Sequence, residues 1–214
     1  CYSKEFNLKN KKKINLPSLP EKYILFLGSQ TYYDESLVLR ELKKTIKDRL
    51  RGFEIVYRPH PWREKASKPI KSVKNIIIDP TLKKGSDKFG SILLPKLDLY
   101  NHIISNASVI IGGCTSMIVE SSLMRKPYLL LAHNDGNPIQ SPFEYYKSSE
   151  HQNLTGILNN ISVCYSLDKL YEEICLLMNK KILNSDPVLE YIISPKYSNF
   201  SIHLKKLIEE KILV

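Results

Sequence analysis

The segment Ser108–Leu131, SVIIGGCTSMIVESSLMRKPYLLL, constrains the fold more than any other part of the chain. Its apolar run Val109–Ile111 leads into a pair of glycines, which indicates a buried parallel strand that ends in a tight turn. A helix is expected to begin at Thr115 or Ser116 and to end at a Lys–Pro pair, before a second apolar strand. Such a unit brings free N–H groups and two hydroxyls to the carboxyl edge of a sheet, which suits a phosphate group. Helix capping alone also explains these hydroxyls, so the segment by itself leaves a ligand role open.

Apolar runs and amphipathic segments alternate along the rest of the chain. Strands are predicted at Tyr23–Leu27, Phe53–Tyr57, Asn75–Ile78, Val109–Ile111, Tyr128–Leu131 and Ile161–Cys164. Helices are predicted at Glu35–Leu50, Asp98–Ser105, the segment after Gly113, Asp168–Lys180 and Tyr197–Lys211, with a loop at His133–Pro142. This alternation predicts an α/β fold, an open parallel Rossmann-like sheet of about six strands with helices on both faces. The ligand site of such a sheet lies outside the carboxyl ends of its strands.

The boundaries of the domain follow from local composition. Residues 1–22 are rich in Lys and Asn and contain two prolines near their end, so we expect a linker or lead-in there. Residues 23–214 are then expected to form the Rossmann-like domain with its C-terminal helices. Because the chain begins with Cys1 rather than Met, we expect it to be a fragment of a longer protein.

Composition excludes several classes of protein. The chain has 214 residues, 43% hydrophobic, which is enough to bury a core, and no apolar run has the length needed to cross a bilayer. Its net charge of +10 favours polyanionic or phosphorylated partners. The one dense basic run, Lys11–Lys13, lacks the interleaved aromatic residues of RNA-binding motifs, so no nucleic-acid partner is expected. Four cysteines without metal-ligand spacing predict free thiols, a cytoplasmic location and no metal.

A second candidate segment, Arg58–Pro59–His60–Pro61, follows the second predicted strand. Two prolines stiffen it, so its guanidinium and imidazole should be held in place. Arg58 can make forked contacts to phosphate oxygens, and His60 can donate a hydrogen bond or, when protonated, add a charge. A surface arginine and a turn histidine would be the plainer interpretation. The expected position of this loop opposite the turn at Gly113 favours the phosphate role.

Glu120 lies about one turn into the predicted helix, on the same face as Ser116. A carboxylate there can accept hydrogen bonds from the vicinal hydroxyls of a ribose. An acidic residue in a first helical turn can also simply complement the helix dipole. Cys114, near the helix N-terminus, is a low-ranked candidate nucleophile because no histidine partner can be assigned to it. The scattered histidines His102, His133, His151 and His203 are each expected to be structural or on the surface.

Together these motifs resemble the C-terminal, donor-binding half of GT-B glycosyltransferases. The resemblance is carried by the RPHP loop, the Gly–Gly–x–Thr–Ser turn, the glutamate four residues on and the Lys–Pro pair before the next strand, within Tyr23–Ala132. The pattern is most similar to enzymes of bacterial capsule, O-antigen and teichoic-acid biosynthesis, including sialyl- and Kdo-transferases and CDP-glycerol glycerophosphotransferases. In these families a second hydroxyl would follow Ser116, whereas here Met117 follows and Thr115 precedes.

The resemblance implies a nucleotide-sugar donor, with a CMP- or CDP-type donor favoured, and no cofactor. The residues implied at the donor site are Arg58, His60, Gly113, Thr115 and Ser116 for the phosphate, Glu120 for the ribose, and Gly28 and Ser29 for a donor loop. The protein would be a glycosyltransferase of surface polysaccharide biosynthesis, cytoplasmic or in peripheral contact with the inner face of the membrane. A carbohydrate or lipid-linked acceptor would bind with the help of an N-terminal lobe that this chain lacks. Two alternatives stay open, namely a UDP-sugar 2-epimerase-like enzyme and a non-catalytic nucleotide-binding or scaffolding module.

Overall fold

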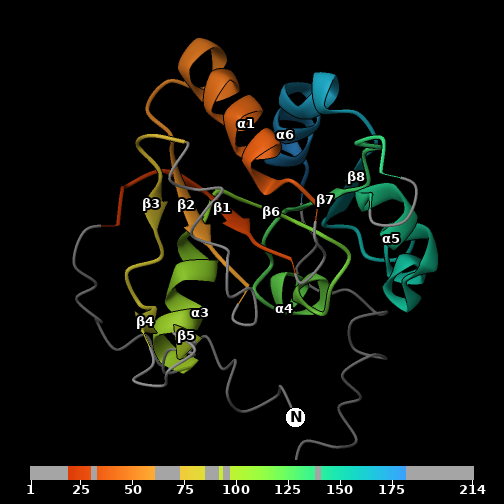
Figure 1. Ribbon diagram of the computed structural model, residues 1–214. Helices are drawn as coiled ribbons and strands as arrows, with labels where there is room; N and C mark the ends of the chain where they lie inside the picture. The colour runs from red at the N-terminus through yellow and green to blue at the C-terminus, as the bar shows by residue number, and fades with distance from the viewer. Residues whose placement is uncertain are drawn as a thin grey trace, which may run out of the picture.

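The computed structural model describes residues 19–29, 33–60, 73–84, 92–93, 97–137 and 141–181. Its centre is a six-stranded parallel sheet with the strand order β3-β2-β1-β6-β7-β8 (Figure 1). The strands are β1 (Tyr23–Leu27), β2 (Glu54–Arg58), β3 (Ile77–Ile78), β6 (Val109–Gly112), β7 (Tyr128–Leu131) and β8 (Ile161–Cys164). The predicted open parallel sheet is confirmed. The predicted helix Tyr197–Lys211 and residues 1–18 of the predicted lead-in lie outside the described residues.

Helices cover both faces of the sheet (Figure 1). On one face lie α1 (Glu35–Arg49) and α6 (Leu170–Asn179), and on the other lie α3 (Leu97–Asn106), α4 (Met117–Leu123) and α5 (Pro142–Ser148). Two short 3-10 turns, η1 (Glu150–Leu154) and η2 (Leu167–Lys169), and a small antiparallel pair, β4 (Lys83–Lys84) with β5 (Ile92–Leu93), complete the described elements. The pair β4–β5 was not predicted.

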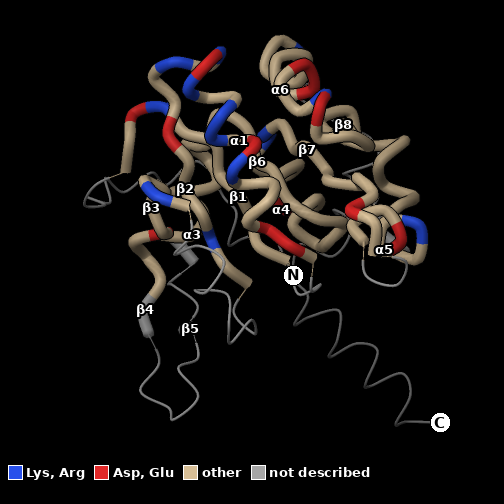
Figure 2. Tube along the Cα trace, turned by 45° about the horizontal axis from the view of Figure 1, so that its top comes forward, with Lys and Arg blue, Asp and Glu red and all other residues tan. Residues whose placement is uncertain are grey.

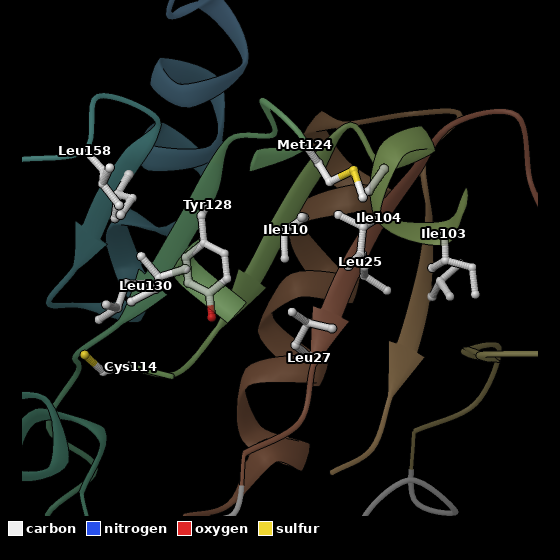
Figure 3. Close-up of a cluster of buried hydrophobic side chains, with 14 of the residues drawn as sticks. Leu25, Leu27, Ile103, Ile104, Ile110, Cys114, Met124, Tyr128, Leu130 and Leu158 are labelled. Atoms are coloured by element: carbon white, nitrogen blue, oxygen red, sulfur yellow. The ribbon is translucent and has the colours of Figure 1, made fainter. Parts of the chain in front are cut away.

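The two cores follow from the alternation of side chains along the strands. In β1, Ile24 and Phe26 pack under α1, whereas Leu25 and Leu27 pack toward α3 and α4. Figure 3 shows the second of these cores, in which Ile103 and Ile104 come from α3 and the rest come mainly from the strands and their ends. β1, β6 and β7, which are buried on both faces, have continuous apolar sequences apart from the glycine that ends β6.

The connections diverge between β1 and β6, which are neighbours in the sheet. From β1 the chain passes through α1 to β2, while from β6 it passes through α4, on the opposite face, to β7. A crevice at the carboxyl ends of two such strands is where open α/β sheets bind their ligands. The fold therefore indicates that a ligand would bind at the loops after β1 and β6.

The segment after β7 contains a helix that was not predicted. The loop expected at His133–Pro142 ends where α5 begins. Ser141 caps this helix by accepting a hydrogen bond from the Glu144 N–H at 3.1 Å. The sequence Ser–Pro–Phe–Glu is a helix-start signal, with proline in the first turn and an acidic residue three positions after the cap. The signal was present but the segment after it is too short for helical periodicity to be evident.

Charged residues are spread over the described surface. Figure 2 shows Lys and Arg on several separate elements, α1 among them, with acidic residues between them. No described helix is both long and apolar enough to span a bilayer. The basic run Lys11–Lys13 lies outside the described residues.

Candidate functional site

Three loops meet at the carboxyl edge of the sheet, after β1, β2 and β6. The Gly28 N–H donates a hydrogen bond to the Arg58 carbonyl at 2.8 Å. A Cβ at Gly28 would lie only 2.9 Å from the His60 backbone nitrogen, so glycine is needed for this approach. On the other side, the Ser29 hydroxyl oxygen lies 3.4 Å from where a Cβ at Gly113 would be. The fold thus brings together the predicted donor loop, the His60 loop and the turn at Gly113.

Arg58 is buried, with only 7% of its surface exposed. Its guanidinium nitrogen Nη1 donates to Oδ2 of Asp79, at the end of β3, at 2.5 Å. The other carboxylate oxygen of Asp79 accepts hydrogen bonds from the backbone N–H and the hydroxyl of Thr81. The bond to Asp79 fixes the guanidinium in place and uses one of its five N–H groups. A guanidinium held in this way can donate its other N–H groups to an anion.

Tyr100 of α3 connects Arg58 to Glu120. The guanidinium carbon of Arg58 lies 4.5 Å from the centroid of the Tyr100 ring, and the Tyr100 hydroxyl donates to Glu120 Oε2 at 2.5 Å. Burial raises the pKa of Glu120, and both the Tyr100 hydrogen bond and the Arg58 charge lower it again. A cation therefore lies over the face of the phenol ring, and a half-buried carboxylate is held by its hydroxyl. Among the described residues the hydrogen bond of Glu120 is made by Oε2, so that Oε1 can accept from a ligand hydroxyl.

Tyr128 of β7 holds the turn between β6 and α4 in place. Its hydroxyl donates to the Gly113 carbonyl at 2.7 Å, and Figure 3 shows the ring extending from β7 with the hydroxyl at its far end. Thr115 Oγ1 accepts a hydrogen bond from the Met117 N–H at 3.3 Å, so Thr115 contributes to starting α4. Ser116 is exposed and its hydroxyl makes no capping bond. Of the two hydroxyls, that of Ser116 is the one available to a ligand.

Cys114 lies beside this turn but is only 1% exposed. Burial raises the pKa of its thiol, which a hydrogen bond with Ser149 partly offsets. Because a thiolate is the reactive form of cysteine, these surroundings do not favour a nucleophilic role.

A buried carboxylate holds the loop after β1. Glu35, the first residue of α1, is 1% exposed and accepts hydrogen bonds from the Ser29 N–H at 2.8 Å and from the Tyr57 hydroxyl at 2.5 Å. Glu35 thereby ties the end of β1 to β2. Sequence analysis missed it because an acidic residue at the start of a helix is usually solvated.

Sequence reasoning also missed Tyr100 and Asp79. Asp79 directly follows the predicted strand Asn75–Ile78, and Tyr100 falls within the predicted helix Asp98–Ser105. Their role depends on the packing of α3 and β3 against the end of β2, which no local pattern reveals. Within the described residues, no group of three or more His, Cys, Asp or Glu side chains could hold a metal ion.

The sequence matches no protein-family model and no curated protein. Its fold, in contrast, is shared with solved structures. The UDP-GlcNAc 2-epimerase of Methanocaldococcus jannaschii, in complex with UDP-GlcNAc and UDP, matches with a TM-score of 0.53 and 16% identity, over 82% of this chain and 44% of that one. A variant of the wall teichoic acid polymerase TagF matches with a TM-score of 0.51 and 14% identity, over 92% of this chain and 45% of that one.

These matches establish the fold of the chain, which is that of one half of a GT-B protein. The predicted resemblance is confirmed at this level. The chain spans less than half the length of the solved chains that it matches.

Proposed function

We propose that this chain is the nucleotide-sugar-binding half of a two-lobed GT-B glycosyltransferase that acts in surface polysaccharide assembly. The observation that supports it most is the meeting of the loops after β1, β2 and β6 beside the linked side chains of Arg58, Tyr100 and Glu120. This arrangement offers a cation, hydroxyls and a carboxylate at one edge of the sheet. The fold is shared with an enzyme that was solved with UDP-GlcNAc and UDP, and with a wall teichoic acid polymerase.

In this proposal the donor phosphates lie between the His60 loop and the Gly113–Ser116 turn. His60 donates a hydrogen bond to a phosphate oxygen, and the Ser116 hydroxyl and the backbone N–H groups of the turn donate others. Arg58, held by Asp79, contributes positive charge close by. Oε1 of Glu120 accepts from the ribose hydroxyls.

The chemistry that this half supplies is positioning and stabilisation of charge. When the bond between sugar and phosphate breaks, negative charge grows on the leaving phosphate oxygens. Donors that are already fixed in place stabilise that charge without having to reorganise. The acceptor and the group that removes its proton are assigned to the second lobe.

Isothermal titration with UDP, CDP and CMP tests whether the chain binds nucleotides and which base it prefers. His60→Ala should weaken binding of the preferred nucleotide by about 1.5–3 kcal/mol, the range for a hydrogen bond to a charged group. His102→Ala is the matched control, because the described bonds of the His102 side chain are with Asn106 on the same helix. An unchanged affinity with a lowered melting temperature would assign His60 to the turn alone. The CMP or CDP preference stays a prediction until this panel is measured.

Glu120→Gln separates ribose from phosphate recognition. The variant should weaken binding of the ribonucleotide more than that of the matching 2′-deoxyribonucleotide, because only the former offers vicinal hydroxyls to the carboxylate. Glu144→Gln, at a partly exposed residue of α5, is the control. Equal losses for both nucleotides would place Glu120 away from the ribose.

A UDP-sugar 2-epimerase is the second candidate, favoured by the match to the archaeal enzyme. Inverting C2 of a sugar breaks its C2–H bond, so an epimerase in D2O should exchange this hydrogen of UDP-GlcNAc with solvent. A glycosyltransferase should instead release nucleotide in an acceptor-dependent manner. The measurement, by NMR on the longer protein that contains this chain, distinguishes the two.

A further inference from the structure

His133, two residues beyond the end of β7, is buried without a hydrogen-bond partner. Its side chain is 3% exposed, and within the part of the chain that the structure describes neither Nδ1 nor Nε2 has a hydrogen-bond partner. Buried polar atoms in proteins are almost always hydrogen-bonded, so two unpaired nitrogens in one ring require an explanation. The ring is almost fully covered, so neighbouring side chains have to move before a hydroxyl can reach these nitrogens. The residue is therefore a candidate for contact with a ligand that the free protein lacks.

The position of His133 is fixed at the same edge of the sheet as the donor site. Its carbonyl accepts a hydrogen bond from the Phe143 N–H of α5 at 3.2 Å, and Ala132 before it still pairs with β8. Its ring packs edge-on against that of Tyr33, with centroids 6.2 Å apart at 87°. Tyr33 stands just before α1, in the connection that leaves β1. His133 and Tyr33 thus meet across the carboxyl end of β6, which lies between β1 and β7.

His133 and Glu120 lie on opposite faces of the sheet. Side chains alternate along β7 and beyond, with Leu131 in the core under α1 and α6 and Ala132 in the core on the α3 side. His133 continues this alternation and contacts Tyr33, which belongs to the core under α1. Glu120 and its partner Tyr100 come from α4 and α3, on the opposite face. A ligand that extends across the edge of the sheet from Glu120 would reach His133 with its other end.

The chemistry of the imidazole indicates which part of the donor reaches His133. Burial lowers the pKa of His133, against the opposing effect of the Asp135 carboxylate. A neutral imidazole offers one N–H donor and one nitrogen acceptor. A sugar hydroxyl both donates and accepts, and so can satisfy such a ring, whereas a phosphate requires donors and positive charge. The cation Arg58 stands on the Glu120 side.

We propose that His133 binds a hydroxyl of the donor's sugar, in a subsite that the ring shares with Tyr33. The nucleotide is held on the side of α3 and α4, and the sugar on the side of α1. This inference rests on the proposed function, since it assigns the sugar of the same donor. It adds a residue that recognises the transferred group rather than the nucleotide.

The test compares nucleotide sugars with their bare nucleotides. Affinities are measured for UDP-GlcNAc, CDP-glycerol and CMP-N-acetylneuraminate and for UDP, CDP and CMP, with the unsubstituted chain, His133→Phe and His133→Gln. His133→Phe keeps an aromatic ring but removes both nitrogens. It should weaken the best nucleotide sugar about 3- to 10-fold, the size of one uncharged hydrogen bond, and leave the matching nucleotide unchanged. His133→Gln, which retains a donor and an acceptor, should restore part of the loss.

The outcomes separate this inference from the function on which it rests. Absence of binding by every nucleotide and nucleotide sugar overturns both. The sugar subsite alone is overturned if the unsubstituted chain binds nucleotides and His133→Phe loses the same affinity for the nucleotide sugar as for the nucleotide. It is also overturned if His133→Phe loses affinity for neither. Because a core substitution can impair folding, the imidazole 15N shifts of His133 are also followed by NMR in the unsubstituted chain. They should move on addition of the nucleotide sugar and not of the nucleotide, and equal movement with both overturns the proposal.

Discussion

The guanidinium of Arg58 stacks over the ring of Tyr100 at 4.5 Å from its centroid. The hydroxyl of the same ring donates to Glu120, so one phenol links the residue assigned to phosphate charge with the residue assigned to the ribose. Tyr100 touches both without being expected to contact the ligand itself. Its two contacts can be separated by substitution.

Tyr100→Phe keeps the stacking on Arg58 and removes the hydroxyl, which contacts both Glu120 and the sulfur of Met117. We expect nucleotide affinity to fall by about 0.5–1.5 kcal/mol, because the carboxylate is no longer held in one orientation. Tyr171→Phe is the matched control. The ring of Tyr171 lies 4.8 Å from the guanidinium of Arg49 on α1, away from the edge of the sheet, and its loss of a hydroxyl should leave affinity unchanged. An unaffected affinity in Tyr100→Phe would separate Glu120 from the binding site.

Stability should also report the protonation of Glu120. Burial raises its pKa above the ordinary value of 4.5, despite Tyr100 and Arg58. The folded protein therefore keeps this proton at pH values where the unfolded chain has lost it. The resulting stabilisation is fully present below about pH 4.5 and is lost as the pH rises through the raised pKa.

Glu120→Gln removes this titration while keeping an oxygen that can accept from Tyr100. We expect the variant to gain melting temperature relative to the unsubstituted chain at pH 7 and to differ little at pH 4. Thermal unfolding of both proteins between pH 4 and pH 7 measures the difference in melting temperature. The other carboxylates titrate alike in both proteins, so their effect cancels from this difference. A difference that does not change with pH would contradict the raised pKa.

The strands illustrate what the sequence could predict. β1, β7 and β8 were predicted at their observed bounds. β1 and β7 are apolar runs buried on both faces, and β8 is a short, mostly apolar edge strand that is partly buried. The convergence of Gly28, His60 and Gly113 was also predictable, because parallel strands end at one edge of the sheet.

The partners of the site residues could not be predicted. Asp79 reaches Arg58 only because β3 pairs with β2, and Tyr100 reaches it only because α3 packs over the end of β2. The burial of Glu35 and His133 was equally invisible, since both are polar residues at the ends of elements, where solvent is the usual partner. Local patterns identify the edge of the sheet, and tertiary packing selects the side chains that meet there.

Glu35→Ala tests the support of the loop after β1. The substitution leaves the Ser29 N–H and the Tyr57 hydroxyl without their buried acceptor, which should cost about 2–4 kcal/mol of unfolding free energy. Urea denaturation measures the loss, with Asp48→Ala, at an exposed residue of α1, as the control. We also expect weaker nucleotide binding, because Ser29 lies against Gly113. A stability loss equal to that of the control would show that the carboxylate is dispensable.

The last prediction concerns turnover. Transfer of a sugar requires a group that orients or deprotonates the acceptor hydroxyl, within hydrogen-bond reach, and a site closed against water. The described residues form one six-stranded sheet and one small two-stranded sheet, and each match covers less than half of the solved chain of the same fold. We therefore expect this chain to fold alone and to bind a nucleotide weakly, because part of the binding energy for the donor belongs to a second lobe.

The same argument predicts that the chain transfers nothing, while the longer protein that contains it does. Chromatography of nucleotide released from UDP-GlcNAc, CDP-glycerol and CMP-N-acetylneuraminate, with both proteins under the same conditions, makes the comparison. The binding measured with the isolated chain serves as the control for correct folding. Turnover by the isolated chain at a rate similar to that of the longer protein would contradict the two-lobed proposal. His60 and Arg58 would then have to act on the reacting atoms directly, since the catalytic groups would have to lie within this half.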